Sequence, residues 1–367
     1  MNKGLVALII VCLLICAAML YLLHVTQRAD DSFSIDSRSG EVSDAQPALS
    51  SVAGSSEPRS SSERAFDCDS LELPDENAER STKHFQETED ELARLAESDD
   101  VEIRIAVAVA TSLSDPEGAH RILSSAEQAA PESPLPLWHL LEFCALYVDA
   151  PGCDTVDTRA VTAHGDNAMF LAKAASLRLG RGDKAAALEL LEQAGSAAYL
   201  DNYWIEHVFL FERALAATGK YSYAERVIDA FGLAAALAIS EYDLVKACRQ
   251  ESGESESWRD ACLAFAQRLY SDSDTLVDKM IGLAMIKSVY ELSGDLKSMR
   301  ETEAIRTSLS DRYVRNDQDA QLLLVKDHNV MRGYLETWEA DGEMAALDFV
   351  RSEVERLSQL PGYDPCK

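Results

Sequence analysis

The apolar positions of this chain follow two different patterns, which a polar stretch separates. Residues Gly4 to Leu23 form an apolar run that no charged residue interrupts. Beyond Cys68, apolar residues recur at helical spacing, Gly, Asp and Pro punctuate the segments, and no convincing period-two stretch occurs. The pattern therefore predicts one N-terminal apolar helix, followed by a folded region that is all-α.

Helices are expected wherever the apolar residues keep the 3.6-residue period. Several start with a capping signal, such as Asp115 before Pro116 and Asp183 after Gly182. The expected ranges are 82–97, 101–113, 116–129, 136–147, 167–179, 183–194, 203–217, 221–238, 241–249, 257–270, 275–292, 296–312, 319–340 and 343–359. Their connections are short and contain glycine, which makes consecutive helices antiparallel hairpins.

The N-terminal apolar run is long enough to cross a bilayer, since a spanning helix needs ~20 residues. A secretory signal peptide is the alternative, but its apolar core usually has only about 7 to 15 residues before a small-x-small cleavage site. Ala17 and Ala18 lie inside the run, and Met19 to Leu23 continue it. An uncleaved signal anchor is favoured, and a lipoprotein is disfavoured because Ile15 precedes Cys16.

The residues that flank this run indicate its orientation. Lys3 precedes it, and Asp30 and Asp31 follow the lone Arg28 on the other side. Because positive residues stay on the cytoplasmic side, the N-terminus is expected inside and the bulk of the chain outside. The prediction is a single-pass protein of a bacterial inner membrane with a periplasmic C-terminal domain.

Residues 24–66 are dominated by Ser, Asp, Glu, Gly and Pro, as the segment 50–62 illustrates. So few apolar side chains cannot offset the entropy of ordering, which predicts a disordered linker. A flexible chain of about 40 residues has a typical end-to-end distance of ~35 Å. The predicted organisation is a cytoplasmic N-terminus (1–3), a transmembrane helix (4–23), a linker (24–66) and an all-helical domain (67–367).

Cysteine usage agrees with an exported domain. Cys12 and Cys16 lie in the predicted span, and the six others are Cys68, Cys144, Cys153, Cys248, Cys262 and Cys366. An even number of cysteines outside the cytoplasm is typical of disulfides. The turn Pro151-Gly152 separates Cys144 from Cys153, and a polar loop separates Cys248 from Cys262. Each is a disulfide candidate, and Cys68 with Cys366 is the third, although six cysteines allow 15 connectivities.

Three turns share the same construction, in which a helix leaves through a glycine and the next helix starts at once. They are Leu179–Asp183, Ala217–Lys220 and Leu292–Asp295. The helices around the first two carry apolar and small residues in matching places. In the first unit these are Leu171, Ala175, Gly182, Ala187, Leu191 and Ala194, and in the second Val208, Leu215, Gly219, Ala224 and Ile228. The turns and their flanking helices indicate an internal repeat.

In these features the chain resembles the tetratricopeptide repeat family, whose antiparallel helix pairs stack into a solenoid. Arg178 stands where the family has an aromatic residue, both closing prolines are missing, and the units are longer than the family period of ~34 residues. Weaker units run through Leu283, Ile286, Tyr290 and Gly294, and through Trp338, Gly342 and Leu347. The resemblance implies an irregular helical-hairpin solenoid and says nothing of the chemistry.

One segment is denser in aromatic residues than the rest of the folded region. It supplies the candidate binding residues Tyr199, Tyr203, Trp204, Tyr221 and Tyr223. Packing between repeat units is one interpretation of these side chains. The other is a place on the concave face, where such solenoids bind peptides.

Charge and motifs narrow the function further. The chain has 63 acidic and 34 basic residues and a net charge of -29, which disfavours nucleic acid and anionic lipid headgroups as partners. The seven histidines lack zinc-site spacing, and no nucleophile-elbow, phosphate-loop or dinucleotide motif occurs. No cofactor, metal or small-molecule substrate is predicted.

The expected function is therefore that of a non-enzymatic interaction or assembly scaffold. The predicted span would tether it in the bilayer, and its partner would be a protein or peptide of the cell envelope. The alternative is an envelope hydrolase whose site is built from residues distant in sequence.

Overall fold

The computed structural model describes residue 66 and residues 78–236, 242–314 and 318–365 of the 367-residue chain. The predicted span, almost all of the linker, Cys68 and Cys366 lie outside these ranges. The secondary structure within them is helical and contains no strand, so the domain is all-α. None of the described helices combines the length and the apolarity that a bilayer crossing requires.

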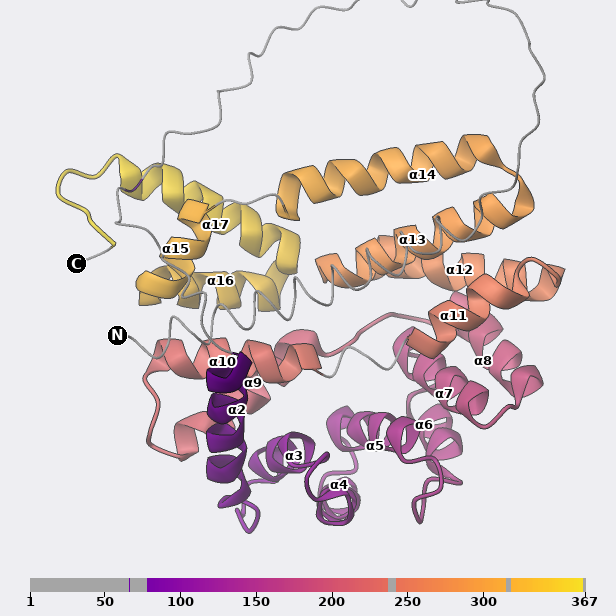
Figure 1. Ribbon diagram of the computed structural model, residues 1–367, viewed down its shortest axis with the longest axis horizontal. Coiled ribbons are helices and arrows are strands. Elements are labelled where there is room, and N and C mark those ends of the chain that lie inside the picture. Colours follow the sequence, from indigo (N-terminus) through magenta and orange to yellow (C-terminus); the bar gives the residue numbers. More distant parts are fainter. Residues whose placement is uncertain (1–65, 67–77, 237–241, 315–317, 366–367) are drawn as a thin grey trace, which may run out of the picture.

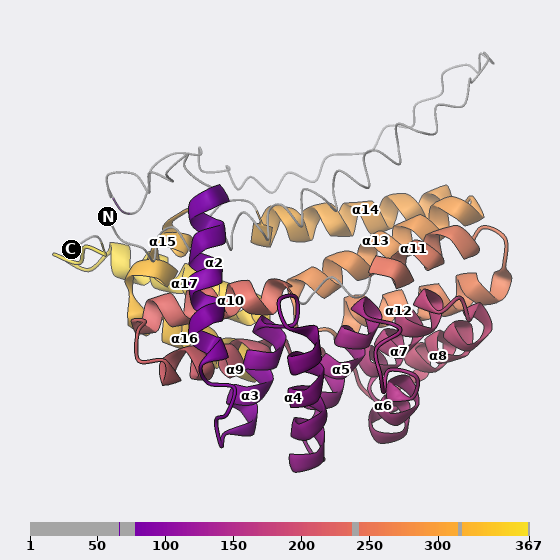
Figure 2. The same cartoon turned by 60° about the horizontal axis from the view of Figure 1, so that its bottom comes forward.

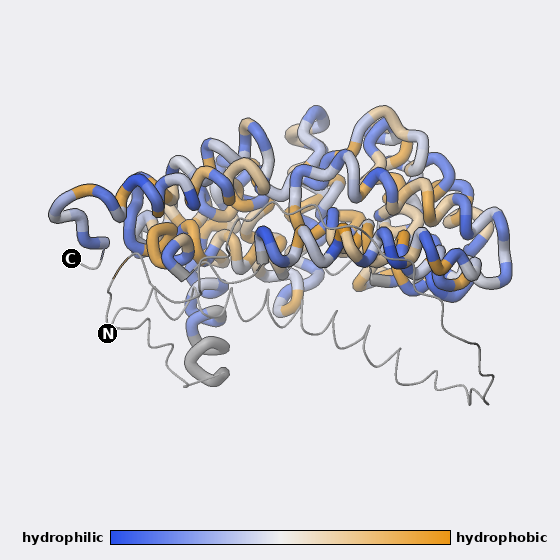
Figure 3. Tube along the Cα trace, turned by 90° about the horizontal axis from the view of Figure 1, so that it is seen from above, coloured by the Kyte–Doolittle hydropathy of each residue, from blue (hydrophilic) through white to orange (hydrophobic). Residues whose placement is uncertain are grey.

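The helices have the following bounds: α2 Ala78–Ala93, α3 Val101–Ala110, α4 Pro116–Ala129, α5 Pro134–Leu146, α6 Val156–His164, α7 Ala168–Gly180, α8 Lys184–Ser196, α9 Trp204–Ala217, α10 Tyr223–Ala236, α11 Tyr242–Glu251, α12 Glu256–Asp272, α13 Leu276–Ser293, α14 Leu296–Leu309, η1 Ser310–Val314, α15 Gln318–Lys326, α16 His328–Asp341 and α17 Glu343–Ser358. Polar and apolar residues alternate along most of them (Figure 3), which is the pattern of helices that bury one face.

The predicted caps and turns are present. Asp115 accepts from Gly118 N, and Asp183 accepts from Ala186 N, so each carboxylate satisfies a free N–H at a helix start. At the three similar turns, Gly182, Gly219 and Gly294 have φ values of 80°, 69° and 76°. This left-handed conformation is costly for residues with a Cβ, which explains the glycines.

The observed helices differ from the expected ones in two places. The range 319–340 is divided into α15 and α16, because the Asp327 side chain accepts from Asn329 N and Val330 N and caps a new helix there. The other difference is α6, which has no clear apolar period. Its Asp157 is buried and forms ion pairs with Arg178 and Arg181 of the α7 end. Long-range pairing thus stabilises a helix that the sequence pattern does not indicate.

The hairpins do not pack in simple chain order. Figures 1 and 2 show α3 to α8 along one edge of the molecule and α12 to α14 along the other, with α15 to α17 beside α10. Helix α8 packs on α7 and α12, whereas the α9–α10 hairpin returns to pack on α3. The two best-matched repeat units, α7–α8 and α9–α10, are therefore separate hairpins with different principal neighbours.

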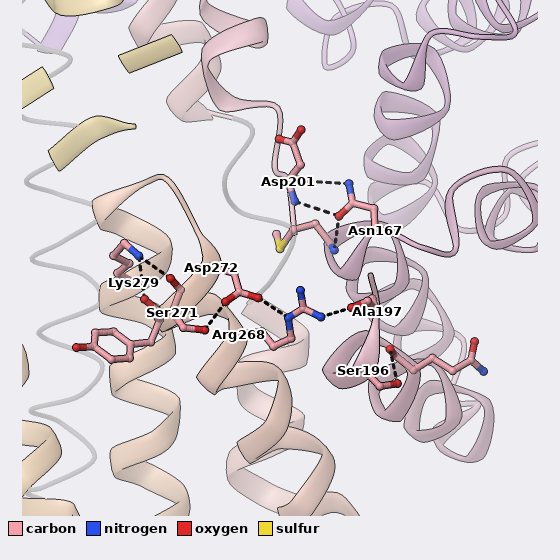
Figure 4. Close-up of polar contacts among 11 residues, drawn as sticks. Asn167, Ser196, Ala197, Asp201, Arg268, Ser271, Asp272 and Lys279 are labelled. Atoms are coloured by element: carbon pink, nitrogen blue, oxygen red, sulfur yellow. Dashed lines mark hydrogen bonds and ion pairs between the residues drawn. The ribbon is translucent and has the colours of Figure 1, made fainter. Parts of the chain in front are cut away.

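Polar contacts fix the position of the connection between α8 and α9 (Figure 4). Asn167 Nδ2 donates to Asp201 O at 2.9 Å, and Asn167 Oδ1 accepts from Asp201 N at 3.2 Å. From the opposite side, the Arg268 guanidinium donates to Ala197 O. This connection is consequently fixed to both α7 and α12.

Candidate binding surface

The predicted binding aromatics lie in two separate places, at opposite ends of α9. Tyr203 is only 8% exposed and packs edge-on against Trp138, with ring centroids 5.4 Å apart. Asn167 Nδ2 donates to the Tyr203 hydroxyl at 3.3 Å, and burial raises the pKa of this tyrosine. Trp204 is partly buried against the same core, whereas Tyr199 is 39% exposed. These three therefore belong mainly to the packed α8–α9 connection.

The other two aromatics lie just before and at the start of α10, where two arginines and a histidine pack around the ring of Tyr223. The guanidinium carbon of Arg226 lies 5.7 Å from its ring centroid, and that of Arg332 lies 5.9 Å away. The His328 ring approaches edge-on at 6.0 Å. Both arginines are within the range of a cation–π contact. We call Tyr223, Arg226, His328 and Arg332 the Tyr223 cluster.

Helical spacing explains how the sequence builds this cluster. Tyr223 and Arg226 are three residues apart on α10, and His328 and Arg332 are four apart on α16. Residues at these spacings share one helix face. Below them, Phe231 of α10 packs against Tyr334 and Trp338 of α16 at ring distances of 6.3 and 5.8 Å. This aromatic layer sets the distance between the two helices.

The two arginines of the Tyr223 cluster differ in their partners and in their exposure to solvent. Arg226 Nε donates to Glu212 Oε1 at 2.7 Å, and its NH1 donates to Tyr221 O at 3.1 Å. Arg332 is exposed, but its guanidinium donates a hydrogen bond to the hydroxyl of Tyr223, and its positive charge favours the ionised form of that tyrosine. Burial raises the pKa of Tyr223, and the charge of Glu212 adds to the shift. Arg226 is thus held in place, while Arg332 and His328 face solvent.

Such a surface suits an anionic group of a protein partner. Arginine binds carboxylates in a two-pronged geometry, and a tyrosine ring offers a rigid apolar face beside it. Tyrosine and arginine are also enriched among the residues that dominate binding energies at protein interfaces. In a chain with a net charge of -29, a local group of two arginines and a histidine stands out.

A second group of charged residues is enclosed between α5, α7 and α9. Glu142 Oε1 accepts from Lys173 Nζ at 2.9 Å, and its Oε2 is 3.0 Å from His139 Nδ1. The Lys173 ammonium lies 4.3 Å from the Trp138 ring centroid. The His207 ring lies 4.8 Å from that of His139. Charges in this interior group are thus paired with one another rather than presented to solvent.

The pKa values in this group follow from that pairing. Burial by itself raises the pKa of Glu142, but the charge of Lys173 and the bond to His139 outweigh it and lower the value to about 2. Burial holds the pKa of His207 well below its ordinary value, and the charge of His139 adds to this.

A broad, open hollow among the described residues lies away from both of these groups, along α14 and η1. It is lined by Glu303, Ala304, Thr307, Ser308, Asp311 and Arg312.

Two of the three predicted disulfides lie within the described residues, and both are present. Cys144 pairs with Cys153 at a Cα separation of 5.4 Å, and Cys248 pairs with Cys262 at 5.7 Å. The first joins the end of α5 to the loop before α6, and the second joins α11 to α12. The pairing of Cys68 with Cys366 stays a prediction.

Sequence reasoning missed Arg226, His328 and Arg332, although it identified Tyr223. The signal was His328 and Arg332, which lie four residues apart at the start of α16 and which the expected single helix 319–340 concealed. No protein-family model matches the chain, and neither curated proteins nor solved structures give a significant match. The tetratricopeptide-like interpretation therefore rests on the repeated glycine turns alone, since the two best-matched hairpins have different principal neighbours.

Proposed function

We propose that this protein is a membrane-tethered scaffold that binds an envelope protein through an acidic segment of that partner. The observation that carries the proposal is the Tyr223 cluster, where Arg332 and His328 face solvent beside a tyrosine ring. The apolar run 4–23 would anchor the chain, and the helical domain would lie in the periplasm. The repeat-like hairpins would serve as a rigid frame for this surface.

Two further observations support this reading. The Cys144–Cys153 and Cys248–Cys262 pairs suit an oxidising compartment. In addition, the Phe66 ring is buried and packs edge-on against Tyr363 at 5.9 Å. The Tyr363 hydroxyl donates at 2.8 Å to Oδ2 of Asp327, which caps α16, so the end of the linker meets the helix that also carries His328 and Arg332. The proposed surface would accordingly belong to the part of the domain nearest the tether.

The test is site-specific photocrosslinking in intact cells. A photoreactive amino acid replaces His328 in the full chain, and a second version carries it at Ile305 on α14, which is 41% exposed. We expect a discrete protein adduct from position 328 that the Ile305 version does not form. The substitution Arg332→Glu should abolish this adduct, whereas Arg300→Glu, on exposed α14, should leave it unchanged.

Two outcomes would contradict the proposal. One is that no adduct forms from position 328, and the other is that the adduct survives Arg332→Glu. Labelling from an enzyme placed on the periplasmic side would test the compartment separately. Absence of labelling there would refute the topology, even if the surface binds a partner.

A further inference from the structure

The starts of α13 and α17 are joined by two reciprocal hydrogen bonds. Leu276 N donates to Glu343 Oε2 at 2.5 Å, and Glu343 N donates to Asp274 O at 2.9 Å. Leu276 and Glu343 are 67 positions apart in the chain. Between them Gly342, at a φ of 84°, lies so close that an added Cβ would be 3.2 Å from Asp274 O. We call this contact the Glu343 junction.

The Glu343 junction lies at the C-terminal end of α16, the helix that carries the candidate surface. Helix α16 begins with His328 and ends at Asp341, and Gly342 then leads directly into Glu343. The solvent-facing members of the Tyr223 cluster lie in the first two turns of α16. The rings of Tyr334 and Trp338, which pack on Phe231 of α10, lie along α16 between the Glu343 junction and the Tyr223 cluster.

Two aspartates act on Glu343, and further acidic side chains act in turn on one of them. The charges of Asp274 and Asp278, before and within α13, act on it directly. Asp201, from the α8–α9 connection, acts on Asp274, and Glu206 of α9 is influenced by Asp201, Asp274 and Glu339 of α16. Lys279 is the cation of this region. Its Nζ donates to Tyr270 O at 2.9 Å and to Ser271 O at 3.4 Å, toward the end of α12 (Figure 4).

Enclosure and negative neighbours make the charge of Glu343 costly. Burial raises its pKa to about 7, the hydrogen bond from Leu276 N opposes the shift, and Asp274 and Asp278 add to it. A neutral carboxyl still offers an oxygen to Leu276 N–H and no longer repels these two aspartates. A raised carboxyl pKa favours the closed junction fully below pH 4.5, the ordinary pKa of a glutamate. That preference is lost as the pH rises from there to about 7.

We propose that the Glu343 junction is a proton-dependent latch that seats α16 against α10 and so regulates access to the Tyr223 cluster. The part that concerns binding rests on the proposed function. The latch itself rests on the two hydrogen bonds, the tight approach of Gly342 and the two aspartates whose charges act on Glu343. In the closed state His328 and Arg332 meet Tyr223, and in the open state α16 is free to shift.

The latch is tested by hydrogen exchange of the full chain in detergent between about pH 5 and pH 8.5, corrected for the intrinsic pH dependence of exchange. The readout is the protection of peptides that contain the amides of Leu276 and Glu343. In the wild type, protection should fall at least about tenfold as the pH rises from about 5 to 7, because Glu343 ionises in the open state over this range but not yet in the closed one, and one pKa unit corresponds to a tenfold change. Glu343→Gln should remain protected throughout, and Glu355→Gln, which changes an exposed acid on the same helix, should behave like the wild type.

If protection in the wild type does not depend on pH, the proposal is overturned. It is also overturned if Glu343→Gln keeps the pH dependence of the wild type. If Glu343→Gln does not fold, Asp274→Asn provides the second variant. It keeps Glu343 but removes one repelling charge, which lowers the pKa of Glu343, so the loss of protection should be smaller and should end at a lower pH than in the wild type. An unchanged pH profile would count against the latch.

Photocrosslinking from position 328 at the same pH values separates the two proposals. A pH-dependent exchange change without any adduct upholds the latch and refutes the proposed function. An adduct with pH-independent exchange does the reverse. If both hold, adduct formation should change with pH in the wild type and stay constant in Glu343→Gln, and a failure of this coupling would overturn the regulatory role.

Discussion

Lys173 and Glu142 form an ion pair inside the domain, with 2.9 Å between Nζ and Oε1 and side-chain exposures of 4% and 10%. They come from α7 and α5, and the Lys173 ammonium also lies over the Trp138 ring. Two charges removed from water have to compensate each other, because neither has solvent as an alternative partner. The consequence of separating them is our first prediction.

Replacing Lys173 by Met should lower the free energy of unfolding by roughly 3 to 5 kcal/mol, because it leaves Glu142 buried without its main cationic partner. Urea unfolding at pH 7 measures the loss. The matched control is Lys184→Met, which removes an ion pair with Glu251 whose lysine is 62% exposed. That change should cost no more than about 1 kcal/mol. Equal losses in the two variants would contradict this prediction, because the buried ion pair would then contribute no more to the free energy of unfolding than the exposed one.

Acid should destabilise the domain through Glu142. Its pKa is lowered to about 2 from an ordinary 4.5, so its contribution is complete above pH 4.5 and is lost as the pH falls through 2. The size of this contribution is roughly 3 kcal/mol. His207 acts in the same direction, since its depressed pKa favours the unfolded state below about pH 6.5.

The measurement is the urea midpoint as a function of pH in the wild type, Glu142→Gln and His207→Gln. Glu142→Gln should be less stable at pH 7 and should lack the loss of stability below pH 4.5. His207→Gln should lack the loss that begins near pH 6.5. An acid profile that is identical in all three proteins would show that other groups govern acid unfolding.

Close helix packing makes Gly282 a sensitive position. A Cβ on this residue of α13 would lie 2.6 Å from Ala266 O and 2.8 Å from Tyr270 N of α12, both backbone atoms. Gly282→Ala should therefore force the helices apart and cost about 1 to 3 kcal/mol in thermal or urea unfolding. The control is Gly180→Ala at the end of α7, where no atom would lie within 4 Å of the new Cβ. That change should be neutral or slightly stabilising.

Cys68 and Cys366 should form the third disulfide. Cys68 follows the buried Phe66 by two residues, and Cys366 follows its ring partner Tyr363 by three. Mass spectrometry of the unreduced protein should therefore find a peptide that links them, in addition to the Cys144–Cys153 and Cys248–Cys262 peptides. Alkylation without reductant should modify neither Cys68 nor Cys366. If all six cysteines outside the apolar run react, the periplasmic placement is wrong.

The amino-acid sequence by itself determined the local structure of this protein. Helix periodicity, the caps Asp115 and Asp183, the glycine turns and the two described disulfides all depend on residues close together in the chain. Such interactions leave a readable spacing, because a helix turn or a short loop closes within a few residues. The all-α class followed from them directly.

Only the tertiary structure decided which hairpins became neighbours and which side chains became functional candidates. It placed α9–α10 on α3, buried Tyr203, brought Arg332 to Tyr223 and joined Glu343 to Leu276. The last two contacts join residues more than a hundred and 67 positions apart, respectively. A carboxylate's pKa depends on the solvent and charges around it, so a sequence in which acids are common cannot single out Glu343.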